Sequence, residues 1–280
     1  MASHKISEEN SGFRAMPIDE DEVRKAWDRN ADLWADRVRA GMDLYREAFN
    51  NPSFLAALPD LTGRDVIDLG CGEGTNTRLL ARRGARMTGI DLSPQMIAAA
   101  HAEEKREPLG IAYDVASYTT RTPFPDGRFD AAVSTMALMD SPDFPAAARE
   151  TFRLLKPGAP FIFSVLHPCF VTPGIRWLKD AEGRDTELVV SRYFDEGSFV
   201  ERWRFSKDPE AELFEKFEVP RFPRRLETYV NGLIDAGFRI TRLTEPRPTE
   251  EMAAAHPWLA RWREHAAIFL YIAAEKPGGA

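Results

Sequence analysis

The chain has 280 residues, of which 44% are hydrophobic and 29% are charged, a composition typical of a globular enzyme built on one large domain. Its net charge of −7 and isoelectric point near 5.4 argue against an extended basic surface, so no nucleic-acid partner is expected. Two cysteines give no disulfide framework, and no apolar run approaches the roughly 18 residues of a membrane span, so we expect a cytoplasmic protein without a membrane segment.

Residues 1–18 are expected to form a loosely packed tail before a single domain over residues 19–280. Acidic residues at positions 19–22 suit the positive N-terminal end of a helix. This helix has one apolar face, formed by Val23, Trp27, Ala31, Trp34 and Val38. A second helical stretch, residues 43–58, contains an asparagine pair and a proline that are expected to break it. We interpret residues 19–60 as a helical lid.

Residues 61–167 and 225–280 alternate between short apolar runs and helical patterns. This alternation predicts βαβ units and a doubly wound α/β fold, in which helices cover both faces of a mostly parallel sheet. Seven strands are expected, at residues 64–69, 86–90, 111–113, 129–134, 160–166, 238–243 and 267–274. One of the intervening helices is expected to be capped by Ser93, with Pro94 in its first turn.

Residues 168–224 interrupt this rhythm with many aromatic side chains separated by charged ones. We interpret the segment as an inserted cap that shapes the substrate pocket. Residues 188–194 and 198–205 are expected to pair as a hairpin across the turn at 195–197.

A glycine-rich turn is the most informative motif in the chain. A β-branched apolar run ends at Asp68 and is followed by glycines at every second position, Gly70, Gly72 and Gly74. Glycine has no Cβ, so the turn can be tight and a ligand can lie against bare backbone. A dinucleotide-binding fingerprint would need its third glycine at position 75, which is Thr75.

The segment around residues 66–76, together with Asp91 at the end of the next expected strand, resembles the glycine motif and second-strand acid of the class I S-adenosylmethionine-dependent methyltransferases. Residues 129–134 resemble the fourth-strand motif of these enzymes, and residues 154–158 resemble the turn before their fifth strand. The resemblance implies a Rossmann-like sheet whose last strand is antiparallel. It also implies S-adenosylmethionine as the cofactor and S-adenosylhomocysteine as the product.

The resemblance also implies roles for individual residues. The expected cofactor-binding residues are Asp68, Gly70, Cys71, Gly72, Gly74, Asn76, Asp91, Leu92, Met96, Asp114, Val115, Ser134, Met136 and Trp27. Among these, Asp91 would accept hydrogen bonds from the ribose hydroxyls, and Asp114 would hold the adenine amino group. The expected substrate-binding residues are Trp34, Met139, Trp177, Tyr193 and Trp203. A structural acid at Asp68 and simple core packing of Trp27 and Trp34 are the competing interpretations.

His167 follows the fifth expected strand and should lie at the carboxyl edge of the sheet, where ligands bind in open α/β folds. An imidazole there could act as a general base; a histidine that only hydrogen-bonds the next loop is the other interpretation. Cys169 invites comparison with the nucleophile of cytosine-C5 methyltransferases, but the acidic chain offers no surface for nucleic acid. The cluster of Arg221, Arg224 and Arg225 is either a solvated face or an anion site.

These observations predict in-line transfer of a methyl group from S-adenosylmethionine to a small-molecule acceptor, an aromatic, quinone-like or isoprenoid O, N or C nucleophile. An RNA or protein methyltransferase and a non-catalytic S-adenosylmethionine-binding protein are the alternatives. A nucleotide-dependent dehydrogenase is disfavoured by Thr75. No metal site is expected, because His256 and His265 lack a ligand pattern around them.

Overall fold

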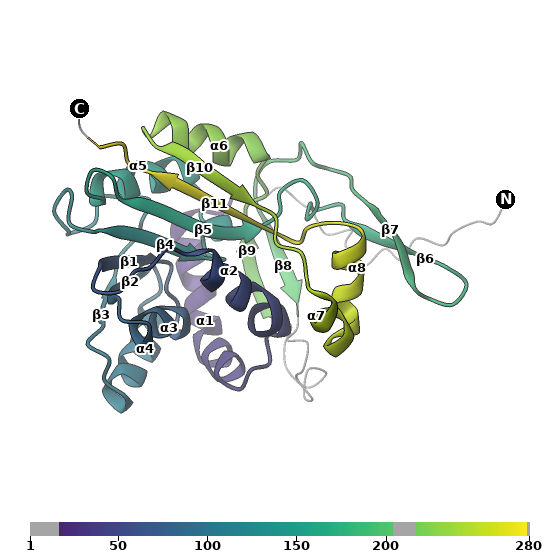
Figure 1. Cartoon of the computed structure of the whole chain (residues 1–280), viewed down its shortest axis with the longest axis horizontal. Coiled ribbons are helices and arrows are strands. Elements are labelled where there is room, and N and C mark those ends of the chain that lie inside the picture. The colour runs from purple at the N-terminus through teal and green to yellow at the C-terminus, as the bar shows by residue number, and fades with distance from the viewer. Residues whose placement is uncertain (1–16, 204–216, 279–280) are drawn as a thin grey trace.

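The computed structural model describes residues 17–203 and 217–278. Its centre is a seven-stranded sheet (Figure 1), ordered β10 (Arg239–Thr244), β11 (Phe269–Glu275), β5 (Pro160–Leu166), β4 (Ala131–Thr135), β1 (Asp65–Leu69), β2 (Arg86–Asp91) and β3 (Ala112–Val115). Strand β11 is antiparallel to both of its neighbours, and the other six strands run parallel. The predicted doubly wound, Rossmann-like sheet with an antiparallel last strand is confirmed.

Helices flank the sheet on both faces (Figure 1). They are α1 (Glu20–Arg39), the π-helix η1 (Arg46–Asn50), α2 (Asn51–Ala57), α3 (Thr75–Arg82), α4 (Pro94–Arg106), η2 (Leu138–Asp140), α5 (Phe144–Leu154), α6 (Leu226–Asp235), α7 (Glu250–Ala255), η3 (Pro257–Leu259) and α8 (Ala260–Glu264). The first helix begins as predicted, because Asp19 and Glu22 form a reciprocal capping box. Ser93 caps α4, where its hydroxyl accepts a hydrogen bond from the Met96 amide.

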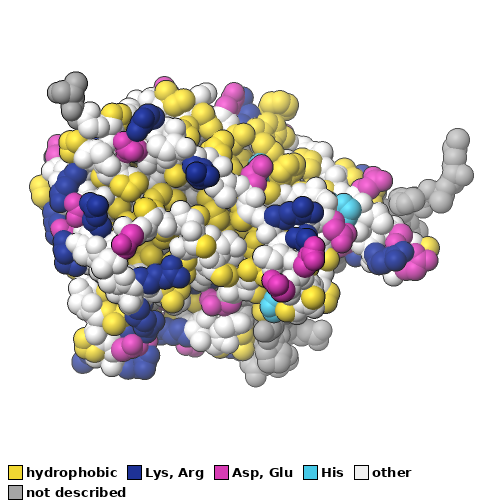
Figure 2. Space-filling view, in the orientation of Figure 1, with side chains coloured by type: hydrophobic (Ala, Val, Ile, Leu, Met, Phe, Trp, Pro, Cys, Tyr) yellow, Lys and Arg dark blue, Asp and Glu magenta, His cyan; other side chains and the backbone are white. Residues whose placement is uncertain are grey.

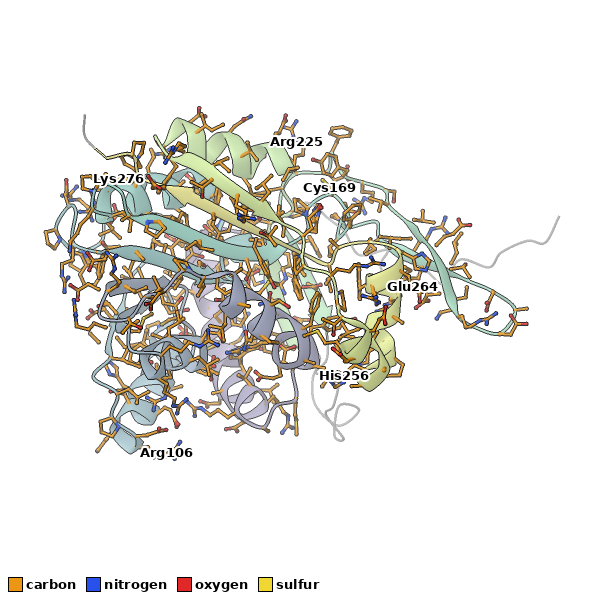
Figure 3. The ribbon with its side chains drawn as sticks, in the orientation of Figure 1. Arg106, Cys169, Arg225, His256, Glu264 and Lys276 are labelled. Carbon is orange, nitrogen blue, oxygen red and sulfur yellow. The ribbon has the colours of Figure 1, made fainter. Side chains whose placement is uncertain are left out.

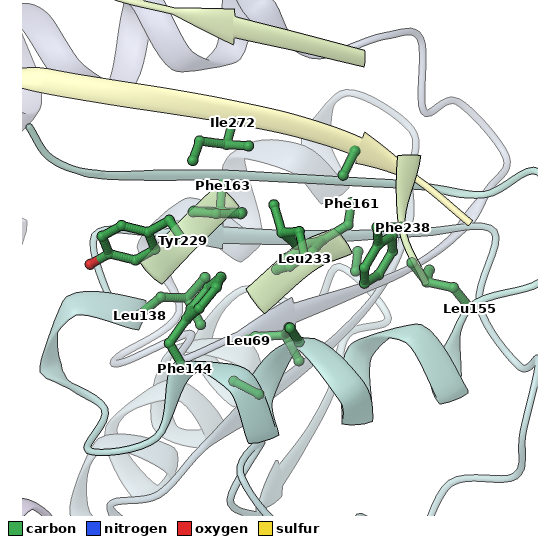
Figure 4. Packing of buried hydrophobic residues seen from close by; sticks show 14 of the residues in the cluster. Leu69, Leu138, Phe144, Leu155, Phe161, Phe163, Tyr229, Leu233, Phe238 and Ile272 are labelled. Atoms are coloured by element: carbon green, nitrogen blue, oxygen red, sulfur yellow. The ribbon is translucent and has the colours of Figure 1, made fainter. Parts of the chain in front are cut away.

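Alternation along the strands divides the core between the two faces of the sheet. The face covered by α5 and α6 contains Phe161 and Phe163 of β5, packed against Phe144 and Tyr229 (Figure 4). Neighbouring residues of a strand face opposite sides of the sheet. In β1, Ile67 belongs to this first cluster, whereas Val66 packs against α3 and α4 on the other face. Burial on both faces explains why these strands read as continuous apolar runs.

The strand order reverses direction beside β1. The chain moves from β1 to β2 and β3 on one side, then crosses back so that β4 and β5 extend the sheet on the other side. At such a switch point the loops leaving neighbouring strands diverge, which opens a crevice at the carboxyl ends of β1 and β4. The glycine turn and the segment after β4 both begin at this crevice.

Residues 168–224 form two separate hairpin-like pairs. Strand β6 (Arg176–Lys179) pairs with β7 (Asp185–Val189), and β8 (Phe199–Trp203) pairs with β9 (Phe217–Arg221). The predicted pairing of residues 188–194 with 198–205 is therefore wrong. Strand β9 buries Phe217 and Val219 against the apolar face of α1, and this contact fixes β8 beside β9. The β6–β7 pair extends away from the sheet (Figure 1).

On the face shown in Figure 2, Lys and Arg side chains are interspersed with Asp and Glu rather than gathered into one area. Among the helices of the described residues, none is both long and apolar enough to cross a membrane.

Candidate active site

A cavity of about 410 Å³ lies at the switch point, within the size range of small-molecule sites. Its walls come from α1, η1, the glycine turn, and the segments that follow β2, β3, β4 and β5. Ten of the residues expected to bind the cofactor line it: Trp27, Asp68, Gly70, Cys71, Gly72, Asn76, Asp91, Leu92, Met96 and Met136. Trp34 and Met139, expected to bind the substrate, line it as well.

The three glycines of the turn have positive φ angles of +74°, +57° and +88°, at Gly70, Gly72 and Gly74. A Cβ at Gly70 would lie 2.3 Å from the Ala137 Cβ, and one at Gly74 would lie 2.5 Å from the Tyr113 hydroxyl. At Gly72 the nearest atom to such a Cβ, Trp34 Nε1, is 4.0 Å away. Packing therefore requires glycine at two positions, whereas Gly72 borders open space in the cavity wall. Gly74 itself is buried behind the cavity.

Two carboxylates flank this turn. Asp91 accepts hydrogen bonds from the amides of Gly72 and Ser93, both at 2.9 Å, so it fixes the turn against the end of β2. Asp68 is buried and accepts a 2.6 Å hydrogen bond from the Thr77 hydroxyl. Burial raises the pKa of each carboxyl to about 6, because the ionised form loses water. Both groups would gain from a ligand that brings hydrogen-bond donors or positive charge.

A polar group that the sequence did not single out closes the turn from the side of η1. Glu73 accepts a 2.8 Å hydrogen bond from Trp34 Nε1, and its other oxygen lies 3.5 Å from Arg46 Nη2. Arg46 Nη2 also donates to Asn76 Oδ1 at 3.2 Å. Burial opposes ionisation of Glu73, but the Arg46 guanidinium and these donors outweigh it and lower its pKa. Arg46 is thereby held over the glycine turn, at the cavity wall.

After β3, the residues that line the cavity lie further along the chain than predicted. Asp114 and Val115 are exposed and do not line it, because β3 is the edge strand and remains paired with β2 through Val115. Ser117 and Tyr118 line the cavity instead. The assignment of the adenine amino group to Asp114 therefore has no support in the geometry. Ser134 is also displaced from its expected role, since its hydroxyl donates to the Leu69 carbonyl at 2.7 Å and ties β4 to β1.

The wall after β4 carries a buried charged group. Asp140, in η2, pairs with Arg221 of β9, and Arg221 Nε donates to Glu201 of β8. All three side chains line the cavity. Although Arg221 counteracts it, burial raises the pKa of Asp140 to about 6. The predicted basic cluster is thus not a free anion site. Arg221 is neutralised by Asp140 and Glu201, and Arg224 donates to the carbonyls of residues 138 and 141. Arg225 pairs with Glu196 and Glu227.

His167 lies at the carboxyl end of β5, as predicted, but outside the cavity. Its Nδ1 accepts a hydrogen bond from the Cys169 amide at 3.2 Å, so Nε2 carries the proton and donates to Glu245 at 2.7 Å. Burial lowers the pKa of the imidazole, which favours this neutral form. Neither nitrogen is free to take a proton from a ligand. Cys169, on the loop beyond β5 (Figure 3), is also absent from the cavity wall in the described part of the chain, and burial raises the pKa of its thiol.

The aromatic residues of the predicted cap do not gather around the cavity. The Trp177 ring packs 5.1 Å from that of Trp262, and the Tyr193 hydroxyl accepts a hydrogen bond from the Leu226 amide at 2.9 Å. Neither side chain lines the cavity, because the β6–β7 pair packs on the C-terminal helices. Trp203 ends β8, and its side chain lies outside the part of the chain that the structure describes. Substrate contacts by Trp177 and Tyr193 are therefore not supported.

Comparison with known proteins identifies the fold and its chemistry. Residues 67–163 match the family model described as a methyltransferase domain. An S-adenosylmethionine-dependent methyltransferase from Mesorhizobium loti is 33% identical, superposes with a TM-score of 0.66, and is matched over 80% of this chain and 96% of its own. The chain belongs to the S-adenosylmethionine-dependent methyltransferases. It is accordingly an enzyme whose cofactor is S-adenosylmethionine.

Two relatives carry names that refer to quinones. A demethylmenaquinone methyltransferase from Tropheryma whipplei is 32% identical over 173 residues, which cover 61% of this chain and 71% of the relative. A ubiquinone biosynthesis O-methyltransferase from Xanthomonas oryzae is 35% identical over 114 residues, covering 41% of this chain and 48% of the relative. The shorter match spans about half of that enzyme.

Sequence reasoning missed several residues of the cavity wall. Glu73 stands inside the glycine motif, and its acidic character was a signal that could have been used. Asp140 follows the fourth-strand motif closely, but its pairing with β9 depends on an insertion whose strand pairing was mispredicted. Asn50 and Arg46 belong to a π-helix, for which the sequence offers no periodic signal.

Proposed function

We propose that this methyltransferase transfers the methyl group of S-adenosylmethionine to a hydroxyl of a small aromatic or quinone-like acceptor. The observation that carries the proposal is a single cavity that begins at the glycine turn and continues to an apolar wall formed by Met136, Met139, Leu166, Val171 and Phe269. One part of such a cavity suits a polar, charged cofactor, and the other suits a largely apolar ring.

The residues at the turn fit S-adenosylmethionine. The open backbone at Gly72 leaves room for the cofactor's chain. The buried carboxylate of Asp68 and the half-buried carboxylate of Asp91 suit its ammonium and hydroxyl donors. Arg46 is placed to pair with its carboxylate. Leu92 and Met96 would contact the adenine ring, beside Tyr118. Residues 19–60, which include α1, would form the lid over this half of the site.

The bound cofactor supplies an electrophilic methyl carbon. With the cofactor bound, the Asp140 carboxylate would accept the proton that the acceptor hydroxyl loses as its oxygen bonds to the methyl carbon, and the electrons of the C–S bond would leave with sulfur. Positioning of the two reactants supplies most of the rate, and proton transfer to a placed base adds about 10²–10⁴-fold.

Asp140 suits the role of the base better than His167. It lines the cavity, and a pKa of about 6 leaves it ionised at neutral pH while keeping it more basic than an ordinary aspartate. His167 lies behind the wall with both ring nitrogens engaged. The proposal therefore replaces the predicted imidazole base with a carboxylate.

The two relatives whose names refer to quinones support this acceptor class, as does the restricted volume of the cavity. An RNA or protein acceptor would require a single nucleotide or side chain to reach the same apolar wall. The mixed charges in Figure 2 offer no basic area on that face for nucleic acid.

The test is release of S-adenosylhomocysteine from S-adenosylmethionine with 1,4-naphthohydroquinone or 3,4-dihydroxybenzoate, in parallel with transfer RNA and casein. We expect release with at least one of the two phenolic probes. We also expect Asp140→Asn to reduce the rate constant by about 10²-fold or more, and His167→Asn to leave it within about 2-fold. Release with RNA or casein alone, or equal losses in the two variants, would refute the proposal.

A further inference from the structure

Asn50 lines the acceptor side of the cavity, and its side chain has incomplete hydrogen bonding. It is 1% exposed, and within the described chain neither its amide nitrogen nor its amide oxygen has a hydrogen-bond partner. Buried side-chain amides are nearly always satisfied, because an unmade hydrogen bond leaves the loss of water uncompensated. A group in this state at a cavity wall is suited to a ligand.

The position of Asn50 assigns it to the acceptor rather than to the cofactor. Its backbone carbonyl accepts a 3.2 Å hydrogen bond from the Tyr271 hydroxyl, and the neighbouring Phe49 ring packs 5.5 Å from that of Phe269. Both partners belong to β11, which is separated from the glycine strand β1 by β5 and β4. Asn50 therefore contacts the strand that lies three positions along the sheet from β1.

The backbone of η1 explains how one short helix serves both halves of the cavity. Its π-helical hydrogen bond runs from the Asn51 amide to the Arg46 carbonyl. Arg46 at its start reaches Glu73 and Asn76 beside the glycine turn, and Asn50 at its end reaches β11. Single turns of π-helix are frequently found at functional sites, where they reorient side chains.

The chemistry of the amide defines what it can bind. Leu166, Ile268 and Phe269 line the same cavity and pack in one cluster with Phe49, the residue before Asn50, so a ligand on this side is largely apolar with one polar substituent. A carboxamide offers an acceptor oxygen and donor hydrogens side by side. A hydroxyl is itself both a donor and an acceptor, so it can hydrogen-bond to either end of the amide. A carboxylate would leave the amide oxygen unsatisfied, and an ammonium would leave the amide hydrogens unsatisfied.

We propose that Asn50 is a specificity-determining residue that binds a second hydroxyl of the acceptor ring, distal to the oxygen that is methylated. This inference rests on the proposed function and narrows its acceptor to dihydroxylated aromatic rings. Asn50 positions the ring through the distal hydroxyl, while the reacting hydroxyl faces the methyl group.

The chain contains a matched control. Asn51, the next residue, is 5% exposed, and its amide atoms likewise have no partner in the described chain, but it does not line the cavity. Asn50→Leu and Asn51→Leu therefore remove the same unsatisfied group from a buried position. Only the first removes it from the cavity wall.

The experiment measures binding of 1,4-naphthohydroquinone and of 1-naphthol, which lacks the second hydroxyl, to the complex with S-adenosylhomocysteine by anaerobic calorimetry. We expect the wild type and Asn51→Leu to bind the diol about 10-fold more tightly than 1-naphthol, and Asn50→Leu to bind the two equally. The affinity for S-adenosylhomocysteine should be unchanged in every variant. Asn50→Ala gives the same comparison if leucine does not fit.

Three results would overturn the assignment: no preference for the diol in the wild type, a preference that survives in both Asn50 variants, or an equal loss in Asn51→Leu. A wild-type preference for the diol without release of S-adenosylhomocysteine from S-adenosylmethionine would refute methyl transfer to this class but support the role of Asn50. Turnover of both probes at equal efficiency would refute Asn50 and leave the proposed function standing.

Discussion

Replacing Asp91 with asparagine should stabilise the ligand-free protein while weakening its hold on the cofactor. Asp91 is half-buried at the cavity wall, and burial raises its carboxyl pKa from 3.8 to about 6. A shift of this size corresponds to at most about 3 kcal/mol of folding free energy that is lost when the group is ionised. Asparagine removes this cost but can keep only one of the two amide hydrogen bonds, which offsets about 1 kcal/mol.

The sign of the pH dependence follows from the raised pKa. The folded protein binds a proton at Asp91 more tightly than the unfolded chain does, so this group favours the fold at low pH and loses that contribution as the pH rises through about 6. The gain from Asp91→Asn should therefore be about 1–2 kcal/mol at pH 8 and close to zero at pH 5. Urea denaturation of the ligand-free protein at the two pH values measures it.

Binding should change in the opposite direction. Loss of a charge-assisted hydrogen bond costs about 1.5–3 kcal/mol, so the affinity of Asp91→Asn for S-adenosylhomocysteine should fall by about 10- to 150-fold at pH 8. Asp114→Asn is the control, because the sequence assigned that exposed acid to the adenine and the structure leaves it outside the cavity. A variant at Asp91 that is destabilised more at pH 8 than at pH 5, or a loss of affinity in Asp114→Asn of similar size, would contradict the reasoning.

Three further outcomes are expected. Gly70 and Gly110 both have a left-handed backbone, with φ of +74° and +76°, so replacing either with alanine introduces strain of about 1–2 kcal/mol. Only at Gly70 does the added Cβ also clash with Ala137. The free energy of unfolding of Gly70→Ala, measured in urea, should therefore be lower than that of Gly110→Ala by about 1–3 kcal/mol. Arg46→Met should destabilise the protein by about 3 kcal/mol at pH 8, measured in the same way, and by less at pH 5, where Glu73 can be neutralised by a proton. If Asp140 is the base, kcat should fall about tenfold per pH unit below pH 6, and a flat profile between pH 5 and 8 would exclude it.

The parts of the fold that could be predicted from sequence are those fixed by local chemistry. Strand β1, its glycine turn and the capped helix after β2 each carry a short-range signal, namely an apolar run, positions without a Cβ, or a serine before a proline. The insertion was mispredicted because the partner of β8 lies beyond residues 204–216, and it is selected by burial of Phe217 against α1, a contact distant in sequence. Pairings that depend on such contacts have no local signature.

In the site too, features set by local sequence could be predicted, and features set by contacts distant in sequence could not. Residues on the turn and at the end of β2 could be placed at the cavity from the motif alone, whereas Asp114 lies outside the cavity wall, exposed on an edge strand. His167 was placed correctly at the end of β5, but its hydrogen bonds could not be predicted, because its partner Glu245 comes from the loop after β10. Position along a strand can be inferred from sequence, but the hydrogen bonds that decide whether a side chain is available to a ligand come from other elements.

Several of the features left unexplained by folding converge on the cavity. Asp68, Asp91 and Asp140 are carboxylates with pKa values raised to about 6, Asn50 has an unsatisfied amide, and Met136 adopts a left-handed backbone at φ 57°. Each is unfavourable in the ligand-free protein, and such features persist in folded proteins where a function requires them. Hydrogen-bond donors and positive charge from the cofactor, and a hydroxyl from the acceptor, would satisfy four of the five. If two ligands complete the cavity, replacing a group that has no buried charged partner, such as Asp91 or Asn50, should raise the stability of the ligand-free protein and weaken binding. Asp140 differs, because its removal would leave Arg221 without its buried partner.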